Sequence, residues 1–303
     1  MHHAVFVTGA TGFVGSAVVR ELLDAGHRVL GLARSDRAAA SLTAAGAEVH
    51  RGALDDLDGL RAAADAADGV IHTAFPHGSA DFAAAARTEI HAIQTLGETL
   101  VGSGRPFVVT SGTAGLTLVP GRVATEDDEQ DLSSPAAARI PGEAAALSFA
   151  ERGVRASVVR LPPSVHGEGD HGFVPHIVAV ARAKGVSAYP GDGSNRWAAG
   201  HRLDAAHLYR LALEEAPGGA RLHAVGDEGV PVRDIADAVG RYLKLPVAAI
   251  PREEAADHFG WLGHFFAMDL PASSTLTRKR LGWHPERPGL VEDLEEGHYF
   301  AKS

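Results

Sequence analysis

Three glycines near the start of the chain, Gly9, Gly12 and Gly15, have the spacing of a phosphate-binding turn. They follow an apolar run at residues 4–8 and open an apolar helical pattern at 13–25. Gly9 permits a tight turn, Gly12 lets backbone N–H groups approach a pyrophosphate, and Gly15 lets the helix pack closely on a sheet. The N-terminus of that helix would stabilise the anion. The pattern predicts a dinucleotide site whose contacts come from Gly9, Thr11, Gly12, Phe13, Val14 and Gly15.

Two residues directly after the second predicted strand (28–33), Arg34 and Ser35, bear on which dinucleotide binds. A carboxylate there would accept a hydrogen bond from the ribose 2′-hydroxyl of NAD, whereas a cation would bind the 2′-phosphate of NADP. The guanidinium of Arg34 can hold a phosphate through two N–H groups, and Ser35 can add a hydroxyl donor. Asp36 is the expected N-cap of the next helix. The sequence favours NADP(H), with a solvated surface charge at Arg34 as the alternative.

Six segments resemble, in order, the extended or atypical branch of the short-chain dehydrogenase/reductase superfamily, which includes NAD-dependent epimerases and dehydratases. They are Thr-Gly-Ala-Thr-Gly-Phe-Val-Gly (8–15), Ile-His-Thr-Ala (71–74), Val-Val-Thr-Ser-Gly (108–112), Arg-Leu-Pro-Pro-Ser-Val-His-Gly (160–167), His-Arg-Leu-Asp (201–204) and Leu-Gly-Trp-His-Pro (281–285). The resemblance covers nearly the whole chain and implies a nicotinamide cofactor. It also implies further cofactor contacts, which would come from Leu54, Thr73, Ala74, Phe75, Arg139, Pro162 and Ser164. An Asp-Leu pair that often holds the adenine in that family is represented by Ala53 and Leu54, with Asp55 one position later.

The catalytic pattern departs from the family that the chain resembles. Members usually carry Tyr-x-x-x-Lys on a helix, where the lysine lowers the pKa of the phenol, and a Ser or Thr after the fifth strand binds the substrate oxygen. Ser111 matches that serine, and Thr113 is the neighbouring alternative. When Glu143 is aligned with a glutamate common in the family, the phenol position holds Pro135 and the lysine position holds Arg139. We therefore do not expect a standard tyrosine mechanism.

Other side chains are candidates for supplying a proton. His77 follows the fourth predicted strand, His171 lies in a glycine-rich loop at 166–172, and Tyr189 follows later in the chain. Histidine has a pKa suited to proton transfer near neutrality. His72 is expected to pack within its strand instead. Three histidines are spaced five residues apart, at His166, His171 and His176. We expect no metal there, because no carboxylate motif accompanies them.

Strand and helix patterns alternate from residue 4 to residue 160, which predicts an α/β fold with a doubly wound parallel sheet of the Rossmann type. We expect residues 1–160 to form an NADP-binding domain, to which the chain returns near 197–225. Residues 161–196 and 226–303 are expected to form a smaller, mostly helical C-terminal substrate lobe. A helix predicted at 253–266 carries Trp261 and Phe265, which we interpret as a wall of the substrate pocket, with core packing as the alternative.

Composition excludes several classes of protein. The chain has 303 residues, is 45% hydrophobic and carries a net charge of −10, which is unlike a disordered chain or a nucleic-acid-binding surface. It has no cysteine, which excludes disulfides and thiol nucleophiles. We expect no membrane span and no secretory signal, and hence a cytoplasmic location. The expected partner is a small-molecule substrate, and a homodimer is left open.

These observations favour one function among three. The leading hypothesis is an NADPH-dependent oxidoreductase that reduces a carbonyl group or a C=N bond of a small, fairly apolar substrate by hydride transfer. A non-catalytic protein that senses or binds NADP(H) is the first alternative, because the Tyr-Lys pair is missing. A nucleotide-sugar epimerase or dehydratase is the second, because the sequence segments follow the layout of the extended branch.

Overall fold

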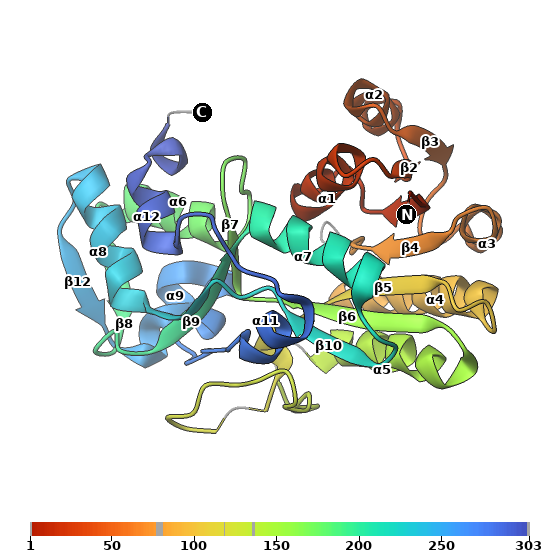
Figure 1. Ribbon diagram of the computed structural model, residues 1–303. Helices are drawn as coiled ribbons and strands as arrows, with labels where there is room; N and C mark the ends of the chain where they lie inside the picture. The colour runs from red at the N-terminus through yellow and green to blue at the C-terminus, as the bar shows by residue number, and fades with distance from the viewer. Residues whose placement is uncertain (1, 77–80, 118, 135–136, 302–303) are drawn as a thin grey trace.

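A seven-stranded sheet forms the centre of the computed structural model, which describes residues 2–76, 81–117, 119–134 and 137–301. The strands are β1 (Ala4–Thr8), β2 (Arg28–Ala33), β3 (Glu48–Arg51), β4 (Gly69–His72), β5 (Pro106–Gly112), β6 (Arg155–Leu161) and β10 (Ala220–His223). All of them pair in parallel, in the order β10-β6-β5-β4-β1-β2-β3 (Figure 1). The predicted doubly wound sheet is confirmed.

Helices cover both faces of this sheet because successive strand residues point to opposite sides. The side chains of Val5 and Val7 pack with α1 (Phe13–Asp24), α2 (Asp36–Ala45) and α7 (Arg202–Glu215). Phe6, between them, packs on the other face with α3 (Leu57–Asp65), α4 (Phe82–Leu100) and α5 (Ile140–Ser148). Buried on both faces, the sheet presents its ligand-binding edge where the parallel strands end.

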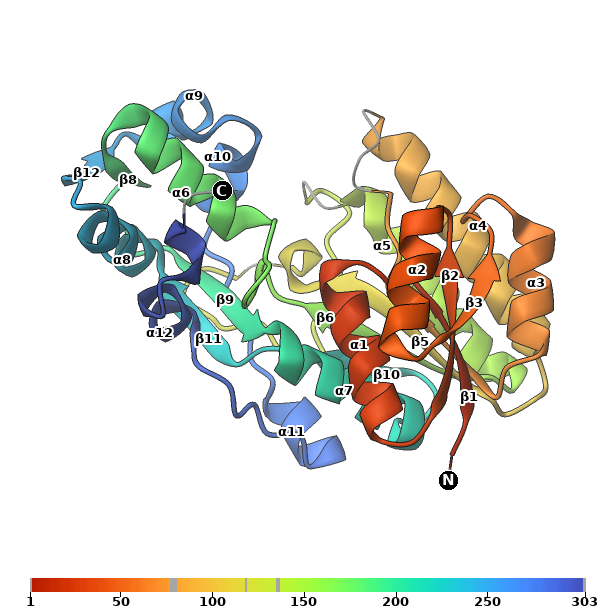
Figure 2. The same cartoon turned by 90° about the horizontal axis from the view of Figure 1, so that it is seen from above.

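The remaining elements form a second, smaller unit, which we call the lobe (Figures 1 and 2). It contains a sheet of β7 (Ser164–His166), β9 (Arg196–His201) and β11 (Asp227–Pro231), and a parallel pair of β8 (Ser187–Pro190) and β12 (Val247–Ile250). Its helices are α6 (Phe173–Lys184), α8 (Val232–Leu243), α9 (Ala255–Phe259), α10 (Gly263–Phe266) and α12 (Leu290–Glu295). All of these strands pair with partners that lie far away in the chain, so local periodicity did not predict them.

Between β9 and β11 the chain returns to the large sheet. There α7 packs against α1, and β10 forms an edge strand beside β6. Helix α11 (Thr275–Leu281) also contacts β10 and α7. Strand β9, which begins the stretch where we expected the return, pairs with β7 and β11 in the lobe instead.

The helix predicted at 253–266 is wrong, because the chain bends sharply within it. Helix α9 ends at Gly260, whose φ of +62° lies in the left-handed region, and a 3₁₀ turn (Gly260–Leu262) leads into α10. Gly263 packs against the backbone of Ala255 so closely that a Cβ atom would collide with it. Trp261 and Phe265 therefore do not share one helix.

Within the described ranges, we find no helix that combines the length and the apolar character required to cross a lipid bilayer.

Candidate functional site

The glycine turn joins β1 to α1 as the sequence predicts. Gly9 has a φ of +68°, and its carbonyl oxygen accepts a hydrogen bond from the Gly12 N–H at 2.9 Å. A Cβ atom at Gly9 would lie 2.6 Å from Oγ1 of Thr73, and one at Gly15 would collide with the carbonyl oxygen of Gly9. The end of β4 therefore packs directly on the turn, which only glycines allow.

The same turn fits a pyrophosphate. The first N–H groups of a helix have no acceptor within it, and no side-chain hydrogen bond caps α1 at Gly12. Thr11 and Gly12 are exposed, whereas Phe13 and Val14 are partly buried. An anion placed here would receive these N–H groups together with the favourable end of the helix dipole. The residues present thus match the phosphates of a dinucleotide.

The end of β2 carries Arg34 and Ser35 at the surface. Arg34 forms no ion pair with any residue in the described ranges. The prediction that Asp36 caps α2 is wrong: Ser35 has an extended backbone, and its hydroxyl accepts a hydrogen bond from the Ala38 N–H at 3.2 Å. Asp36 is the first helical residue and accepts a hydrogen bond from Arg51 at 2.7 Å. The Asp36 carboxylate is thus paired with Arg51 and not with Arg34.

The other residues expected at the cofactor lie along the ends of the strands. Oγ1 of Thr73 donates a hydrogen bond to the Thr8 carbonyl at 2.8 Å, and the backbone N of Ala74 would lie 2.7 Å from a Cβ atom at Gly9. Leu54, beyond β3, is partly buried against the helices of the α3–α5 face. Pro162 and Ser164, beyond β6, are buried. The structure therefore brings Thr73 and Ala74 against the turn.

Arg139 lies directly before α5 and is held from two sides. Its guanidinium donates to the carboxylate of Glu89 on α4 at 2.6 Å and 3.3 Å, and it stacks 4.3 Å from the ring centre of Phe75. Burial raises the pKa of Glu89, and the charge of Arg139 opposes that shift. The sequence did not indicate Glu89, which is 50 residues from its partner. Arg139 is thus a rigidly positioned cation at the lysine position of the family pattern.

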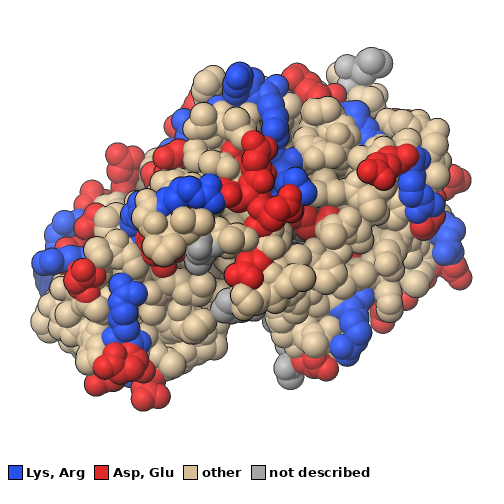
Figure 3. Space-filling model, turned by 90° about the horizontal axis from the view of Figure 1, so that it is seen from below, with Lys and Arg blue, Asp and Glu red and all other residues tan. Residues whose placement is uncertain are grey.

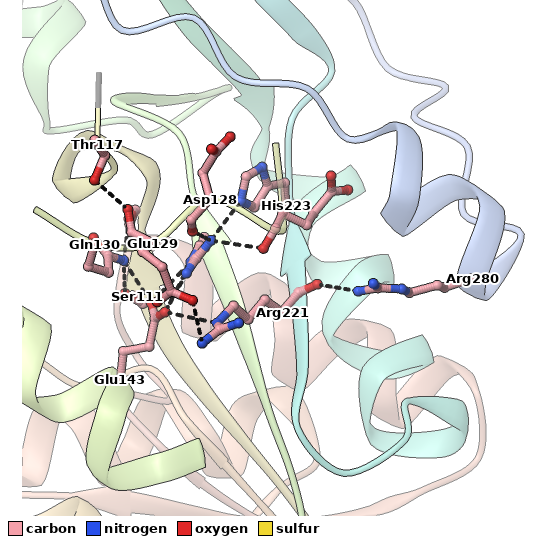
Figure 4. Close-up of polar contacts among 12 residues, drawn as sticks. Ser111, Thr117, Asp128, Glu129, Gln130, Glu143, Arg221, His223 and Arg280 are labelled. Atoms are coloured by element: carbon pink, nitrogen blue, oxygen red, sulfur yellow. Dashed lines mark hydrogen bonds and ion pairs between the residues drawn. The ribbon is translucent and has the colours of Figure 1, made fainter. Parts of the chain in front are cut away.

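Ser111, at the end of β5, belongs to a polar network (Figure 4). Nε2 of Gln130 lies 3.5 Å from its hydroxyl oxygen and 2.8 Å from the Glu143 carboxylate, and Ser111 also donates a hydrogen bond toward Glu143. Sequence reasoning missed Gln130, because it lies in a loop with no periodic pattern. The Ser111 hydroxyl is thus engaged by groups within the protein.

Arg160 anchors this network from β6. It is fully buried, and its guanidinium donates to Glu143 at 2.5 Å and to the carbonyl oxygens of Glu126 and Asp128 at 3.2 Å and 3.1 Å. Burial acts to raise the pKa of Glu143, but the hydrogen bonds and charge of Arg160, aided by Ser111, bring it below its usual value. Hydrogen bonds from the buried Arg160 guanidinium therefore tie the loop that contains residues 126–130 to the sheet.

Thr113 lies two residues beyond Ser111, in a 3₁₀ turn (Thr113–Gly115). Its side chain is 3% exposed, and Oγ1 is buried without a hydrogen-bond partner in the part of the chain that the structure describes. A buried hydroxyl without a partner is costly, and a hydrogen bond from a bound ligand would offset that cost. Of the two hydroxyl candidates, Thr113 is thus the one whose hydroxyl has no hydrogen-bond partner among the described residues.

A loop at 167–172 connects the lobe to the glycine turn. The ring of His171 packs on that of Phe13 at 5.8 Å, and the guanidinium of Arg202 lies 4.9 Å from the centre of the same ring. Within the loop, the Gly167 N–H donates to the Tyr299 hydroxyl at 3.0 Å, and that hydroxyl donates to Asp170 at 3.2 Å. The loop is thus held by the end of the chain while it touches the first residue of α1.

Two further candidates for supplying the proton are His77 and Tyr189. His77 lies outside the described residues, as does Pro135 at the phenol position. Tyr189 lies in β8, where it pairs with β12 and packs under Arg233 at 5.5 Å. Figures 1 and 2 place β8 at the end of the lobe far from β5, so the structure does not bring Tyr189 to Ser111. The sequence did not indicate that residues 187–190 form a strand of the lobe, so it could not separate Tyr189 from the end of β5.

The three histidines of 166–176 point to different partners. Nδ1 of His166 pairs with Asp293 at 2.9 Å, and His176 bonds the carbonyl oxygen of Phe259 at 2.9 Å. Asp293 also lies close to Glu296 and His298, with ligand atoms within 4.8 Å of one another. The Asp293 carboxylate is already hydrogen-bonded to His166, so this group is a structural contact between α12 and β7.

Comparison with known proteins agrees with the fold and the glycine turn. An uncharacterized protein of Schizosaccharomyces pombe is 49% identical over 296 residues, which cover 98% of this chain and 99% of the relative. An uncharacterized protein of Saccharomyces cerevisiae is 47% identical over 296 residues, covering 97% of this chain and 98% of that protein. A 2-alkyl-3-oxoalkanoate reductase of Stenotrophomonas maltophilia is 29% identical over 274 residues, 84% of this chain and 78% of the reductase.

Solved structures show the same architecture. The UDP-glucose 4-epimerase of Thermotoga maritima superposes with a TM-score of 0.78 at 21% identity, covering 98% of both chains. The sequence profile of the NAD dependent epimerase/dehydratase family matches residues 5–224, more than half of the chain and the whole of the glycine turn, β5 and β6. This protein therefore belongs to the NAD dependent epimerase/dehydratase family.

Proposed function

We propose that this protein is an NADPH-dependent oxidoreductase that reduces a carbonyl group or a C=N bond of a small, fairly apolar molecule. The observation that carries the proposal is Arg34, an exposed cation that forms no ion pair in the described ranges and lies at the end of β2. A cation at this point suits the 2′-phosphate of NADP. NADPH is consumed in reductions, whereas the epimerases and dehydratases of this family recycle a tightly bound NAD. The cofactor preference thus favours reduction.

In this proposal the protein binds and orients, while the bound dinucleotide supplies the hydride. The glycine turn and the N-terminus of α1 hold the pyrophosphate, and Arg34 and Ser35 hold the 2′-phosphate. Arg139 takes the place of the family lysine at the ribose. The Thr113 hydroxyl donates a hydrogen bond to the oxygen or nitrogen of the acceptor as negative charge develops on it.

The proton source distinguishes the acceptors that such a site could reduce. The phenol position of the family pattern holds Pro135, so the proton comes from water or a histidine. An iminium acceptor is already protonated and tolerates this loss best. The name of the Stenotrophomonas relative, a reductase of 3-oxoalkanoates, supports a carbonyl acceptor as well.

A substrate panel tests the proposal against the other two functions. Purified protein would be incubated with NADPH and ketones, aldehydes or cyclic imines, and oxidation of NADPH followed by its absorbance. We expect oxidation that depends on one acceptor class. Tight NADPH binding without oxidation by any acceptor would favour a sensing protein, and conversion of a nucleotide sugar without net NADPH use would favour an epimerase.

Replacing Arg34 tests the cofactor assignment directly. Arg34→Ala should weaken NADPH binding by roughly ten- to a hundredfold, because a charged hydrogen-bond partner is worth about 1.5–3 kcal/mol. NADH binding should change little, since NADH has no 2′-phosphate. Arg28→Ala is the matched control, because Arg28 is an exposed arginine at the opposite end of the same strand. Equal losses for both nucleotides, measured by calorimetric titration, would overturn the assignment.

A further inference from the structure

Aromatic side chains gather on the side of the lobe where α6 begins. The ring of Phe173 lies 5.6 Å from Trp197, 5.4 Å from Trp261 and 6.4 Å from Phe265, and His176 lies 5.2 Å from Trp261. Trp197 and Phe265 anchor the group, because Trp197 is fully buried and its indole N–H donates to the Phe265 carbonyl at 3.1 Å. The rings thus form a fixed platform rather than a mobile surface patch.

Trp261 is the exposed member of this platform. It is 61% exposed, whereas Trp197 and Trp283 are 0% and 1% exposed. It sits on the 3₁₀ turn that follows Gly260, and Phe173 and His176 support its ring. Leaving an indole in water forfeits a large apolar burial, which a ligand covering the ring would recover.

The platform borders the segment that carries the candidate catalytic hydroxyl. Ala114, the residue after Thr113, packs against the same apolar cluster as Phe173 and Phe265. In Figure 2 the turn after β5 (yellow) lies between the lobe and the sheet, below α10. Figure 3 shows a notch between the two parts of the molecule. The residue next to Thr113 and the rings of the platform thus pack in one apolar cluster.

The lack of cations in the platform favours an uncharged substrate over a nucleotide sugar. The segments that form it, 173–181 and 255–267, contain no Lys or Arg. A nucleotide sugar carries a diphosphate, which needs cations or helix N-terminal N–H groups around it. An uncharged ring system needs neither and gains by stacking on indole.

We propose that the substrate carries a planar, uncharged aromatic group, which stacks on Trp261 beside Phe173 while its carbonyl or C=N group points to Thr113. This inference rests on the proposed function, because it names the substrate class of the same site. It makes Trp261 a specificity-determining residue and separates this chain from family members that act on nucleotide sugars.

Fluorescence tests the platform without requiring turnover. Because Trp197 and Trp283 are buried, quenching by acrylamide reports mainly on Trp261. With NADPH present, 1-phenylethanol and its saturated analogue 1-cyclohexylethanol serve as probes that accept no hydride. We expect 1-phenylethanol to protect Trp261 at concentrations roughly three- to tenfold lower than 1-cyclohexylethanol. Equal protection by the two alcohols would overturn the proposal, and protection that depends only on protein concentration would show that a second copy covers the platform.

Variants separate this inference from the proposed function. Trp261→Leu should abolish the preference for the phenyl probe, whereas Trp261→Phe should retain most of it, and NADPH affinity should stay unchanged in both. Tyr242→Leu, at an exposed aromatic residue on α8, is the matched control. If the phenyl preference is present but no ketone or imine is reduced, the platform stands and the proposed reductase fails. If aryl and cyclohexyl ketones are reduced alike by the wild type and by Trp261→Leu, the reductase stands and the platform fails.

Discussion

Ser111, at the end of β5, and Thr113, two residues later, have different surroundings. Ser111 is engaged by Gln130 and Glu143, whereas Oγ1 of Thr113 has no partner in the described ranges. We expect Thr113→Val to lower kcat roughly a hundredfold or more with little change in NADPH affinity, because one donor to a developing charge is worth about 2.7–4 kcal/mol. Ser111→Ala should lower kcat much less. Steady-state kinetics on the best acceptor of the panel measure both values of kcat. A larger loss of kcat for Ser111→Ala than for Thr113→Val would show that Ser111 is the donor to the acceptor.

At the scale of elements, the loop at 167–172 links the lobe to the start of α1. The Tyr299 hydroxyl joins the Gly167 N–H and Asp170, and His171 lies on Phe13. Tyr299→Phe removes two hydrogen bonds, each worth about 1 kcal/mol, so the loop should leave the nucleotide site more often. We expect NADPH to dissociate roughly tenfold faster, as measured by stopped-flow fluorescence. Tyr189→Phe removes the hydroxyl of a tyrosine on β8 and is the control, and a dissociation rate equal to that of this control would refute the link.

At the scale of the whole molecule, histidines that are buried or partly buried couple stability to pH. Burial lowers the pKa of His72 to about 3, and burial lowers those of His201 and His223 to about 4, from a usual value of 6.5. Between these values the unfolded chain binds protons that the folded chain does not, so stability is full above pH 6.5 and falls as the pH drops toward 4. Each such group contributes a slope of up to about 1.4 kcal/mol per pH unit.

Urea unfolding at several pH values measures this slope. His72→Asn keeps a side-chain partner for the Thr8 hydroxyl, which lies 2.8 Å from Nδ1 of His72, but it cannot be protonated. We expect the variant to lose stability less steeply between pH 6.5 and pH 4 than the wild type. His91→Asn, at an exposed position on α4, controls for the substitution itself. A slope in His72→Asn that matches the wild type would show that His72 does not take part.

Much of the large sheet could be predicted because its signals are local. The strands at 4–8 and 28–33 match the structure residue for residue, since an apolar run that forms a buried strand acts within one element. The helix predicted at 253–266 failed because apolar spacing continues through Gly260, where the backbone turns. Its bend depends on Gly263 packing against Ala255, a contact that periodicity does not encode.

The sequence by itself determined the glycine turn and the cation at the end of β2, and it predicted that the tyrosine and lysine of the family pattern are replaced by Pro135 and Arg139. Each of these features is a short local pattern, so the residue types and their spacing within a few positions are enough to indicate it. Only the tertiary structure decided that Glu89 holds Arg139, that Gln130 and Glu143 engage Ser111, and that Thr113 keeps a free hydroxyl. These contacts join separate helices, strands and loops, and their geometry follows from how whole elements pack, because burial and chain connectivity select the partners rather than any pattern in neighbouring residues.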